Sequence, residues 1–158
     1  MNEKDKFSNH FRDAQPKFSR FYTIVLSKLG LTLPQYALLS QLVIAGTLPM
    51  TQISKRLHIT KPAVTNLVDR LEKSKFLKRV PHPSDRRVYL LEIQPKGSKA
   101  VRETQSQILN VLLKTLAEFS AEEQKTINRY YASVSQALGE VLGKREQLKS
   151  NSHPRVNR

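Results

Sequence analysis

Around residue 75 the spacing of apolar residues changes abruptly, and this change constrains the fold more than any other feature of the chain. Before it, apolar side chains recur every three or four residues, which is the period of an amphipathic helix. After it, residues 76–80 and 88–93 form two short runs rich in β-branched, aromatic and leucine side chains. The polar segment 81–87 between them contains two prolines. We therefore predict two strands joined by a turn-rich loop.

The first third of the chain is predicted to be helical. Phenylalanine, tyrosine and aliphatic residues follow a helical spacing from Phe7 to Leu29, and Pro16 either kinks this helix or marks its start. Gly30 is a natural helix stop. Thr32 and the glutamine three residues later form a capping box, so a second helix is expected to begin there and to end at Ala45-Gly46.

Two further short helices are predicted immediately before the strands. The first covers about residues 51–57 and is followed by a tight connection at His58-Ile59. Thr60 is suited to cap the second, which has Pro62 in its first turn. Two short helices joined by a turn of this length form a helix-turn-helix pattern. The following hairpin, which we call the wing, carries two adjacent arginines in its loop.

The segment after the wing is again predicted to be helical. A long helix is expected over about residues 95–117, and Ser120 with Glu123 forms a second capping box for the last helix. Gly143 is predicted to end that helix. The remaining residues, 144–158, are polar and basic, which favours a disordered tail.

The predicted fold is therefore mainly α (α+β minor): a winged helix-turn-helix with a two-stranded wing hairpin and N- and C-terminal dimerisation helices. The terminal helices carry apolar side chains that the winged core does not need, so burial against a second copy in a homodimer is expected. The alternative is a monomer with a helical cap. The expected domains are 1–31 (N-terminal dimerisation helix), 32–94 (DNA-binding domain), 95–143 (C-terminal dimerisation helices) and 144–158 (tail).

Charge and composition indicate a polyanionic partner. The 158 residues carry a formal net charge of +14, and residues 50–102 alone hold 13 basic and 4 acidic side chains. This clustering is typical of a phosphate-binding surface, although a merely soluble basic face remains the alternative. The chain has no cysteine, no apolar run long enough to span a membrane and no apolar stretch typical of a signal peptide. We expect a cytoplasmic protein without thiol chemistry, cofactor or metal; the four histidines show no ligand spacing.

The second helix of the helix-turn-helix supplies the first group of candidate site residues. Its outward positions would enter the major groove of double-stranded DNA, where asparagine suits adenine and a threonine methyl group suits thymine. A lysine there is better suited to a phosphate. In the alternative interpretation, Thr60 and Asn66 are only a local cap and a surface polar residue. The candidate residues are Thr60, Lys61, Val64, Thr65, Asn66 and Arg70.

The wing supplies the second group of candidates. Arg86 and Arg87 would suit a narrow minor groove, where the negative potential is deepest over A·T-rich sequence. Asp85 is expected to cap the turn and to orient an arginine. Asp69, on the preceding helix, is a further expected partner of Arg87. In the alternative interpretation, the wing binds no ligand and these residues form only a charged turn.

The order of elements, together with Leu67-Val68-Asp69-Arg70-Leu71-Glu72-Lys73 and Asp85-Arg86-Arg87, resembles the MarR family of bacterial transcriptional regulators. The resemblance covers about residues 10–143. It implies a dimeric winged helix-turn-helix repressor of palindromic operators that is released by a small aromatic or lipophilic ligand. The family's wing Asp-x-Arg falls on Asp85 and Arg87, and Asp69 matches the aspartate that pairs with the wing arginine.

Two departures from the family pattern stand out. Lys75 occupies a position where many members have glycine, and His82 replaces an acidic residue before the wing proline. We expect Phe18, Tyr22 and Tyr36 to line an effector pocket. The rival hypothesis is a non-specific architectural DNA-coating protein. An enzyme would need a convergent acid/base set, and the sequence offers none.

Overall fold

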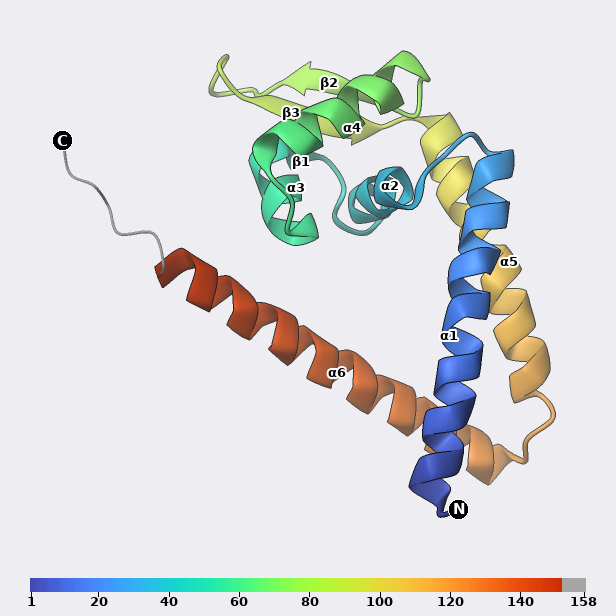
Figure 1. Ribbon diagram of the computed structural model, residues 1–158. Helices are drawn as coiled ribbons and strands as arrows, with labels where there is room; N and C mark the ends of the chain where they lie inside the picture. Colours follow the sequence, from blue (N-terminus) through green and yellow to red (C-terminus); the bar gives the residue numbers. More distant parts are fainter. Residues whose placement is uncertain (152–158) are drawn as a thin grey trace. The chain divides into compact units, whose positions relative to one another are not determined.

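The computed structural model describes the backbone of residues 1–151 and the side chains of residues 1–143. It divides into two compact units, residues 1–109 and the residues from 110 onward. Figure 1 shows the elements along the chain. The helices are α1 (Glu3–Lys28), α2 (Leu33–Ala45), α3 (Met50–Leu57), α4 (Lys61–Lys73), α5 (Pro95–Leu116) and α6 (Ala121–Asn151), and the strands are β1 (Leu48–Pro49), β2 (Leu77–Pro81) and β3 (Tyr89–Ile93).

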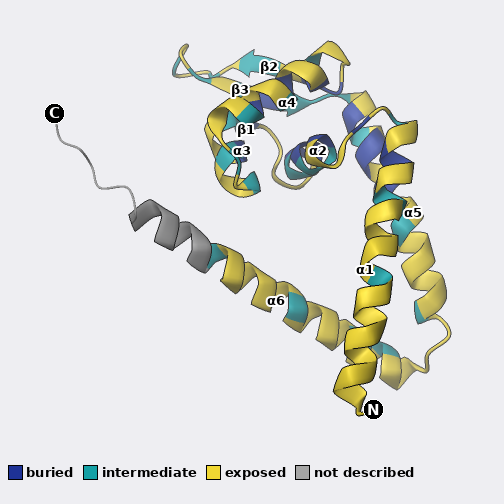
Figure 2. Ribbon diagram, viewed as in Figure 1, coloured by how far each residue is buried: buried dark blue, intermediate teal, exposed yellow. Residues whose placement is uncertain are grey.

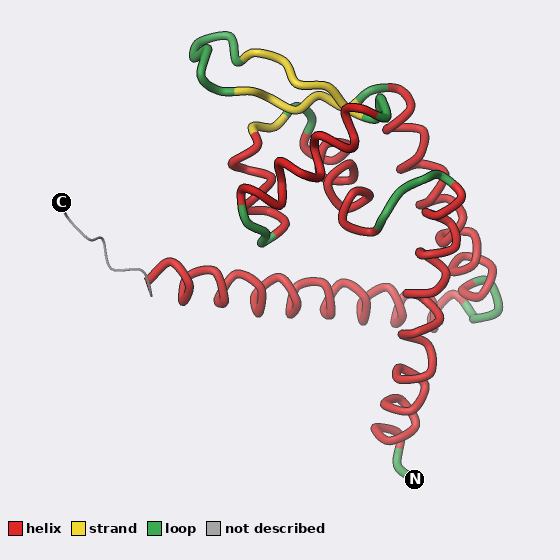
Figure 3. The backbone as a smooth tube through the Cα atoms, turned by 45° about the horizontal axis from the view of Figure 1, so that its top comes forward, coloured by secondary structure: helices red, strands yellow, loops and turns green. Residues whose placement is uncertain are grey.

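The sheet has three antiparallel strands in the order β1-β3-β2. The wing is the β2–β3 hairpin, in which Lys78 lies opposite Glu92 and pairs with it at 2.8 Å. β1 adds a third strand through the pairing of Leu48 with Leu91. The sequence predicted only the two wing strands, because a strand of two residues is too short to show a period. The three strands form one small sheet from which the wing loop extends (Figure 3).

The hydrophobic core of the first unit lies among α2, α3, α4 and the sheet, and it includes the C-terminal end of α1 and the first turns of α5 (Figure 2). Burial is concentrated there because α3 and α4 each present one apolar stripe to the same centre, where they meet the largely apolar α2. Only Val25 and Leu26 are buried in α1, close to its C-terminal end. The side chains with 0% exposure are Leu38, Leu39, Ile53, Val68, Leu71, Leu77, Leu91, Val101 and Thr104.

Local hydrogen bonds fix the helix ends that the sequence predicted. Thr32 and Gln35 form the expected capping box at the start of α2. At the end of α1, the Leu31 amide donates to the Leu26 carbonyl at 2.9 Å, with Gly30 at φ 68°. This is a Schellman turn, in which a left-handed residue lets the chain leave the helix.

The same turn ends α3 and α4 without a glycine. His58 and Lys75 have φ values of 55° and 61°. After α4, the Lys75 amide donates to the Glu72 carbonyl and the Phe76 amide to the Leu71 carbonyl, both at 2.9 Å. Lysine therefore adopts the left-handed conformation that glycine adopts more easily.

Two long helices continue past residues that were expected to limit them. α1 is continuous through Pro16, so it does not begin there. Pro16 has no amide hydrogen to donate to the carbonyl of Arg12, four residues earlier. Arg12 is exposed, so water can bond to that carbonyl instead. α6 continues through Gly143 to Asn151, because a glycine inside a helix costs only about 1 kcal/mol and does not stop it. The prediction of a disordered tail from residue 144 is wrong up to Asn151, and residues 152–158 lie outside the described residues.

The capping box of α6 is formed as expected. The Ser120 amide and hydroxyl both donate to Glu123 Oε2, at 2.8 and 2.6 Å. The hydroxyl bond and then the backbone bond hold the pKa of Glu123 below its usual value. None of the described side chains of α6 is buried.

The first turn of α5 packs tightly against the chain that follows α4. The Gln94 amide donates to the Phe76 carbonyl at 3.0 Å, and Lys96 Nζ donates to the Ser74 carbonyl at 2.9 Å. The same ammonium group lies 4.3 Å from the centre of the Phe76 ring. A Cβ atom on Gly97 would lie 2.2 Å from the Phe76 carbonyl oxygen, so only glycine fits at this position.

We predict that Gly97→Ala lowers the free energy of unfolding by about 1–3 kcal/mol, because the backbone at Phe76 has to move. Urea denaturation followed by circular dichroism measures the effect. Gly139→Ala is the matched control, since it is also helical and a Cβ atom there has no neighbour within 4 Å. Equal stability of the two variants would contradict the close approach.

Candidate nucleic-acid interface

The burial of one face of α4 decides which of its side chains face outward. Val64, Val68 and Leu71 are 1%, 0% and 0% exposed, and they follow the i, i+4, i+7 spacing of a helical stripe. The expected DNA contact from Val64 is therefore wrong, because this side chain lies in the core. The exposed residues of α4 include Lys61, Thr65, Asn66 and Arg70, which were also candidates.

Three polar residues near the N-terminus of α4 have different environments. The Thr60 hydroxyl oxygen accepts from the Ala63 amide at 3.4 Å, so Thr60 acts as the N-cap. The Thr65 hydroxyl donates to the Lys61 carbonyl at 3.1 Å. Within the described part of the chain, the Asn66 amide group has no hydrogen-bond partner. Its donors and acceptor are therefore available to another molecule.

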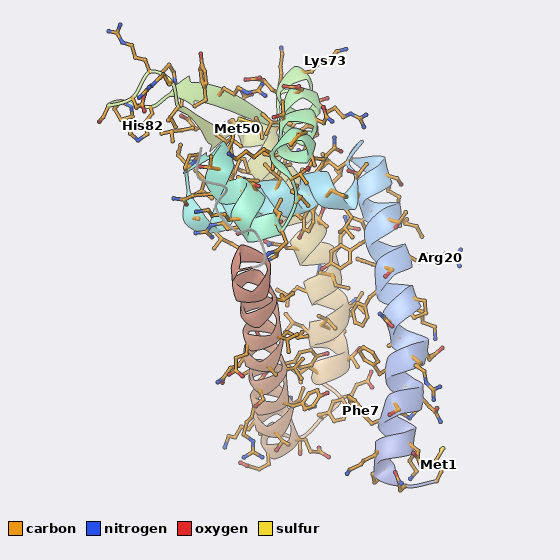
Figure 4. The ribbon with its side chains drawn as sticks, turned by 60° about the vertical axis from the view of Figure 1, so that its left-hand side comes forward. Met1, Phe7, Arg20, Met50, Lys73 and His82 are labelled. Atoms are coloured by element: carbon orange, nitrogen blue, oxygen red, sulfur yellow. The ribbon has the colours of Figure 1, made fainter. Side chains whose placement is uncertain are left out.

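The wing loop presents two arginines beyond the sheet. The Arg87 amide donates to Asp85 Oδ1 at 3.0 Å, and Arg87 Nε lies 3.3 Å from the same oxygen. Asp85 thus caps the turn and orients Arg87, as predicted, while the Arg87 side chain remains 91% exposed. Arg86 is also exposed. His82 lies in the same loop, where its Nδ1 accepts from the Ser84 amide at 3.2 Å (Figure 4).

Asp69 does not pair with Arg87. Its carboxylate accepts from Arg79 Nη2 at 2.5 Å, and the other end of the same guanidinium bonds to Glu72. The Arg79 amide also donates to Glu72 Oε1 at 2.8 Å. Asp69 and Glu72 lie one turn apart on α4, whereas Arg79 lies in β2, so this cluster joins the helix to the wing. We call Arg79, Asp69 and Glu72 the Arg79 clamp.

The Arg79 clamp also changes the electrostatics of the exposed face of α4. Partial burial lowers the pKa of the Arg79 guanidinium, but the hydrogen bonds to Asp69 and Glu72 outweigh it and raise that pKa above its usual value. Both carboxylates of α4 are thus matched by a cation. Lys61, Arg70 and Lys73 remain exposed on the same helix (Figure 4 marks Lys73), so the exposed surface of α4 is cationic.

Sequence reasoning missed the role of Arg79. It placed Arg79 on a strand and considered Asp69 only as a partner for Arg87. The useful signal was Asp69 and Glu72 at i and i+3, followed within ten residues by an arginine on the adjoining strand.

The predicted effector residues are only partly brought together. The rings of Tyr22 in α1 and Tyr36 in α2 lie 5.9 Å apart at 42°. Burial, and then the proximity of Tyr36, raise the pKa of the Tyr22 phenol. Phe18 lies one turn before Tyr22 on α1 and is 37% exposed.

Among the described side chains, no three acidic or histidine residues come close enough to hold a metal ion. Over the same part of the chain, every helix is too short or too polar to cross a membrane.

Comparison with known proteins agrees with this architecture. The MarR family profile matches residues 31–89. The uncharacterized HTH-type transcriptional regulator YfiV of Bacillus subtilis is 31% identical over 111 residues, which cover 70% of this chain and 69% of YfiV. A MarR family protein from Bacillus stearothermophilus has a TM-score of 0.74 at 24% identity, over 88% of this chain and 99% of that one. A mutant of MepR from S. aureus, solved with a bound oligodeoxyribonucleotide, has a TM-score of 0.65 at 24% identity and covers 84% of this chain and 97% of its own.

The helix-turn-helix of α3 and α4, followed by the β2–β3 hairpin, defines a winged helix-turn-helix protein, a class that binds DNA. The matched profile and the sequence identity to YfiV identify the family within this class, which the fold alone does not. The chain belongs to the MarR family of transcriptional regulators.

We predict that Arg79→Gln lowers the free energy of unfolding by about 1–3 kcal/mol, because it removes the cationic donor of Asp69 and leaves Glu72 with only the backbone amide of residue 79. Lys78→Gln is the matched control on the same strand. It removes an exposed pair with Glu92, which is worth at most about 1 kcal/mol. Urea denaturation of both variants measures the difference, and a smaller loss in Arg79→Gln than in Lys78→Gln would contradict the clamp.

Proposed function

We propose that this protein is a sequence-specific, double-stranded-DNA-binding repressor that acts as a homodimer on a palindromic operator. The observation that supports it most is the outward face of α4. There Lys61, Thr65, Asn66 and Arg70 are exposed, while both carboxylates of the helix are held by Arg79. Such a face offers base-reading and phosphate-binding groups without uncompensated negative charge.

On DNA, each protomer inserts α4 into a major groove and the wing loop into the adjoining minor groove. Thr65 and Asn66 meet base edges, and Lys61 binds a phosphate. Arg86 and Arg87 enter the minor groove, where A·T-rich sequence narrows the groove and deepens its negative potential. Thr60 contributes indirectly, because as the N-cap it stabilises the first turn of α4, which carries Lys61.

Exposed apolar side chains support the dimer. The three long helices expose many more apolar side chains than the few scattered ones that are usual on the surface of a monomer. A two-fold dimer buries them and presents two copies of α4 to half-sites about 10 bp apart. They are Phe7, Phe11, Phe18 and Ile24 on α1, Leu109, Val111, Leu112 and Leu113 on α5, and Tyr130, Tyr131, Leu138, Val141 and Leu142 on α6.

Repression follows from steric occlusion of a promoter, and a small aromatic or lipophilic effector relieves it. The Tyr22–Tyr36 pair supports an aromatic ligand, since partly buried rings offer stacking and edge contacts. Phe18 extends this surface along α1. A ligand that favours a different separation of the two α4 helices lowers operator affinity.

Competition binding tests the proposal. A duplex is selected from a random library with the wild-type protein, and its binding is challenged with an excess of random duplex at physiological salt. We expect a palindrome that is preferred by at least about 10³-fold. Equal competition by random DNA would instead support the non-specific coating protein, for which the high net charge alone would suffice.

We predict that Arg87→Ala weakens operator binding about tenfold or more without lowering stability, because the side chain is 91% exposed and its ion pair with Asp85 lies at the surface. Fluorescence anisotropy with the selected duplex measures the change. Arg12→Ala, an exposed arginine on α1, is the matched control. If both variants bind like the wild type, the wing does not contact DNA.

We predict that Lys61→Ala reduces the slope of log K against log salt by about 1.8 for a dimer, because each protomer loses one phosphate contact worth about 0.9. Lys17→Ala, a lysine of α1 whose side chain is 71% exposed, controls for net charge. A slope equal to that of the Lys17 variant would remove Lys61 from the phosphate contacts.

We predict that Leu138→Asp produces a folded monomer, because a charge in the dimer interface is desolvated without a partner. Leu138 is 57% exposed, so the substitution leaves the core intact. Sedimentation velocity measures the mass. Gln136→Asp, an exposed residue on the opposite face of α6, is expected to remain dimeric. A dimeric Leu138 variant would place the interface elsewhere.

A further inference from the structure

The hydrogen bonding of Thr65 deepens the proposed function, on which the following inference rests. The Thr65 side chain is exposed on the outward face of α4, one turn after Lys61. Its hydroxyl donates to the Lys61 carbonyl at 3.1 Å. We propose that Thr65 determines operator specificity through its methyl group, which contacts the C5-methyl group of a thymine in the major groove.

The internal hydrogen bond changes what Thr65 can recognise. A threonine hydroxyl has one donor hydrogen, and here that hydrogen points to the backbone of the preceding turn. Donation to a guanine or adenine acceptor would require this bond to break. The methyl group needs no such rearrangement, and neither does acceptance by the hydroxyl oxygen from adenine N6 or cytosine N4, so the neighbouring side chains decide between these two contacts.

The neighbouring residue Pro62 makes this part of α4 locally apolar. Pro62 is exposed and lies three residues before Thr65, a spacing that places both on one face of the helix. The face thus presents a pyrrolidine ring and a methyl group beside the cationic side chain of Lys61. Among the base edges of the major groove, only thymine presents a methyl group that can fill such a contact.

Asn66 supplies the hydrogen bonds that Thr65 does not. Its amide group has no partner within the described side chains and can bond to an adenine through both donor and acceptor. Thr65 and Asn66 therefore divide base recognition between an apolar and a polar contact. Loss of the Thr65 contact then weakens binding at one base pair without abolishing it.

The test removes single methyl groups from the DNA. In the selected duplex, each thymine of a half-site is replaced in turn by deoxyuridine, which differs only in lacking the C5-methyl group. The symmetry-related position in the other half-site is replaced at the same time. Fluorescence anisotropy measures the affinity. We expect one such pair of replacements to weaken wild-type binding about fifteenfold, or about fourfold per half-site, from the loss of one buried methyl contact in each.

Protein variants identify the residue that senses this methyl group. Thr65→Ser removes the methyl group and keeps the hydroxyl, so it is expected to bind the thymine and deoxyuridine duplexes equally. Thr65→Val keeps a methyl group and removes the hydroxyl, so it is expected to retain the wild-type discrimination. Thr23→Ser is the matched control, because Thr23 is an exposed helical threonine whose hydroxyl also donates to the carbonyl four residues earlier, at 3.0 Å.

Each contrary result has a distinct meaning. If the selected duplex binds specifically but no deoxyuridine replacement weakens wild-type binding, the methyl contact is overturned and the proposed function stands. If Thr65→Val loses discrimination while Thr65→Ser keeps it, the hydroxyl is the recognising group and the inference is equally overturned. If selection recovers no preferred sequence, the proposed function fails and this inference fails with it.

Discussion

The burial of a single stripe on α4 determines which surface this protein can present to another molecule. Val64, Val68 and Leu71 are almost wholly inaccessible, and they lock the rotation of the helix about its axis. Because side chains on a helix follow a fixed angular spacing, that rotation alone puts Thr65 and Asn66 on the outside. Core packing thus decides which side chains of α4 are available for the proposed base recognition.

A second constraint keeps the wing in a defined position relative to that helix. The Arg79 clamp joins two carboxylates of α4 to strand β2 of the wing. The close approach of Gly97 to the Phe76 carbonyl holds the chain between α4 and β2 against the start of α5. Asp69 lies one turn after Thr65 and Asn66, so the clamp also pairs the carboxylate next to these two exposed side chains with a cation. Both contacts belong to the first unit, so α4 and the wing loop share one supported framework, which lowers the ordering cost of the proposed binding to two grooves.

Much of the fold could be predicted from the sequence because its signals are local. The capping boxes at Thr32 and Ser120 mark their helices, and the change of period at residue 75 marks the wing. The errors concern features that depend on tertiary packing or on length. Val64 could not be assigned to the core from a helix in which several apolar positions compete for burial, and β1 is too short to have a pattern. The partner of Asp69 depends on which arginine the folded sheet brings nearest, and spacing along the chain does not specify that. The effector residues remain a prediction.

Methylation footprinting of the selected operator tests the central claim most directly, because dimethyl sulfate modifies guanine N7 in the major groove and adenine N3 in the minor groove. A molecule that inserts α4 and the Arg86-Arg87 loop side by side protects both kinds of atom in one experiment. The account predicts two patches of guanine N7 protection about 10 bp apart, each beside protected adenine N3 atoms. Protection of guanine N7 with fully reactive adenine N3, or no localised protection at physiological salt, would contradict it.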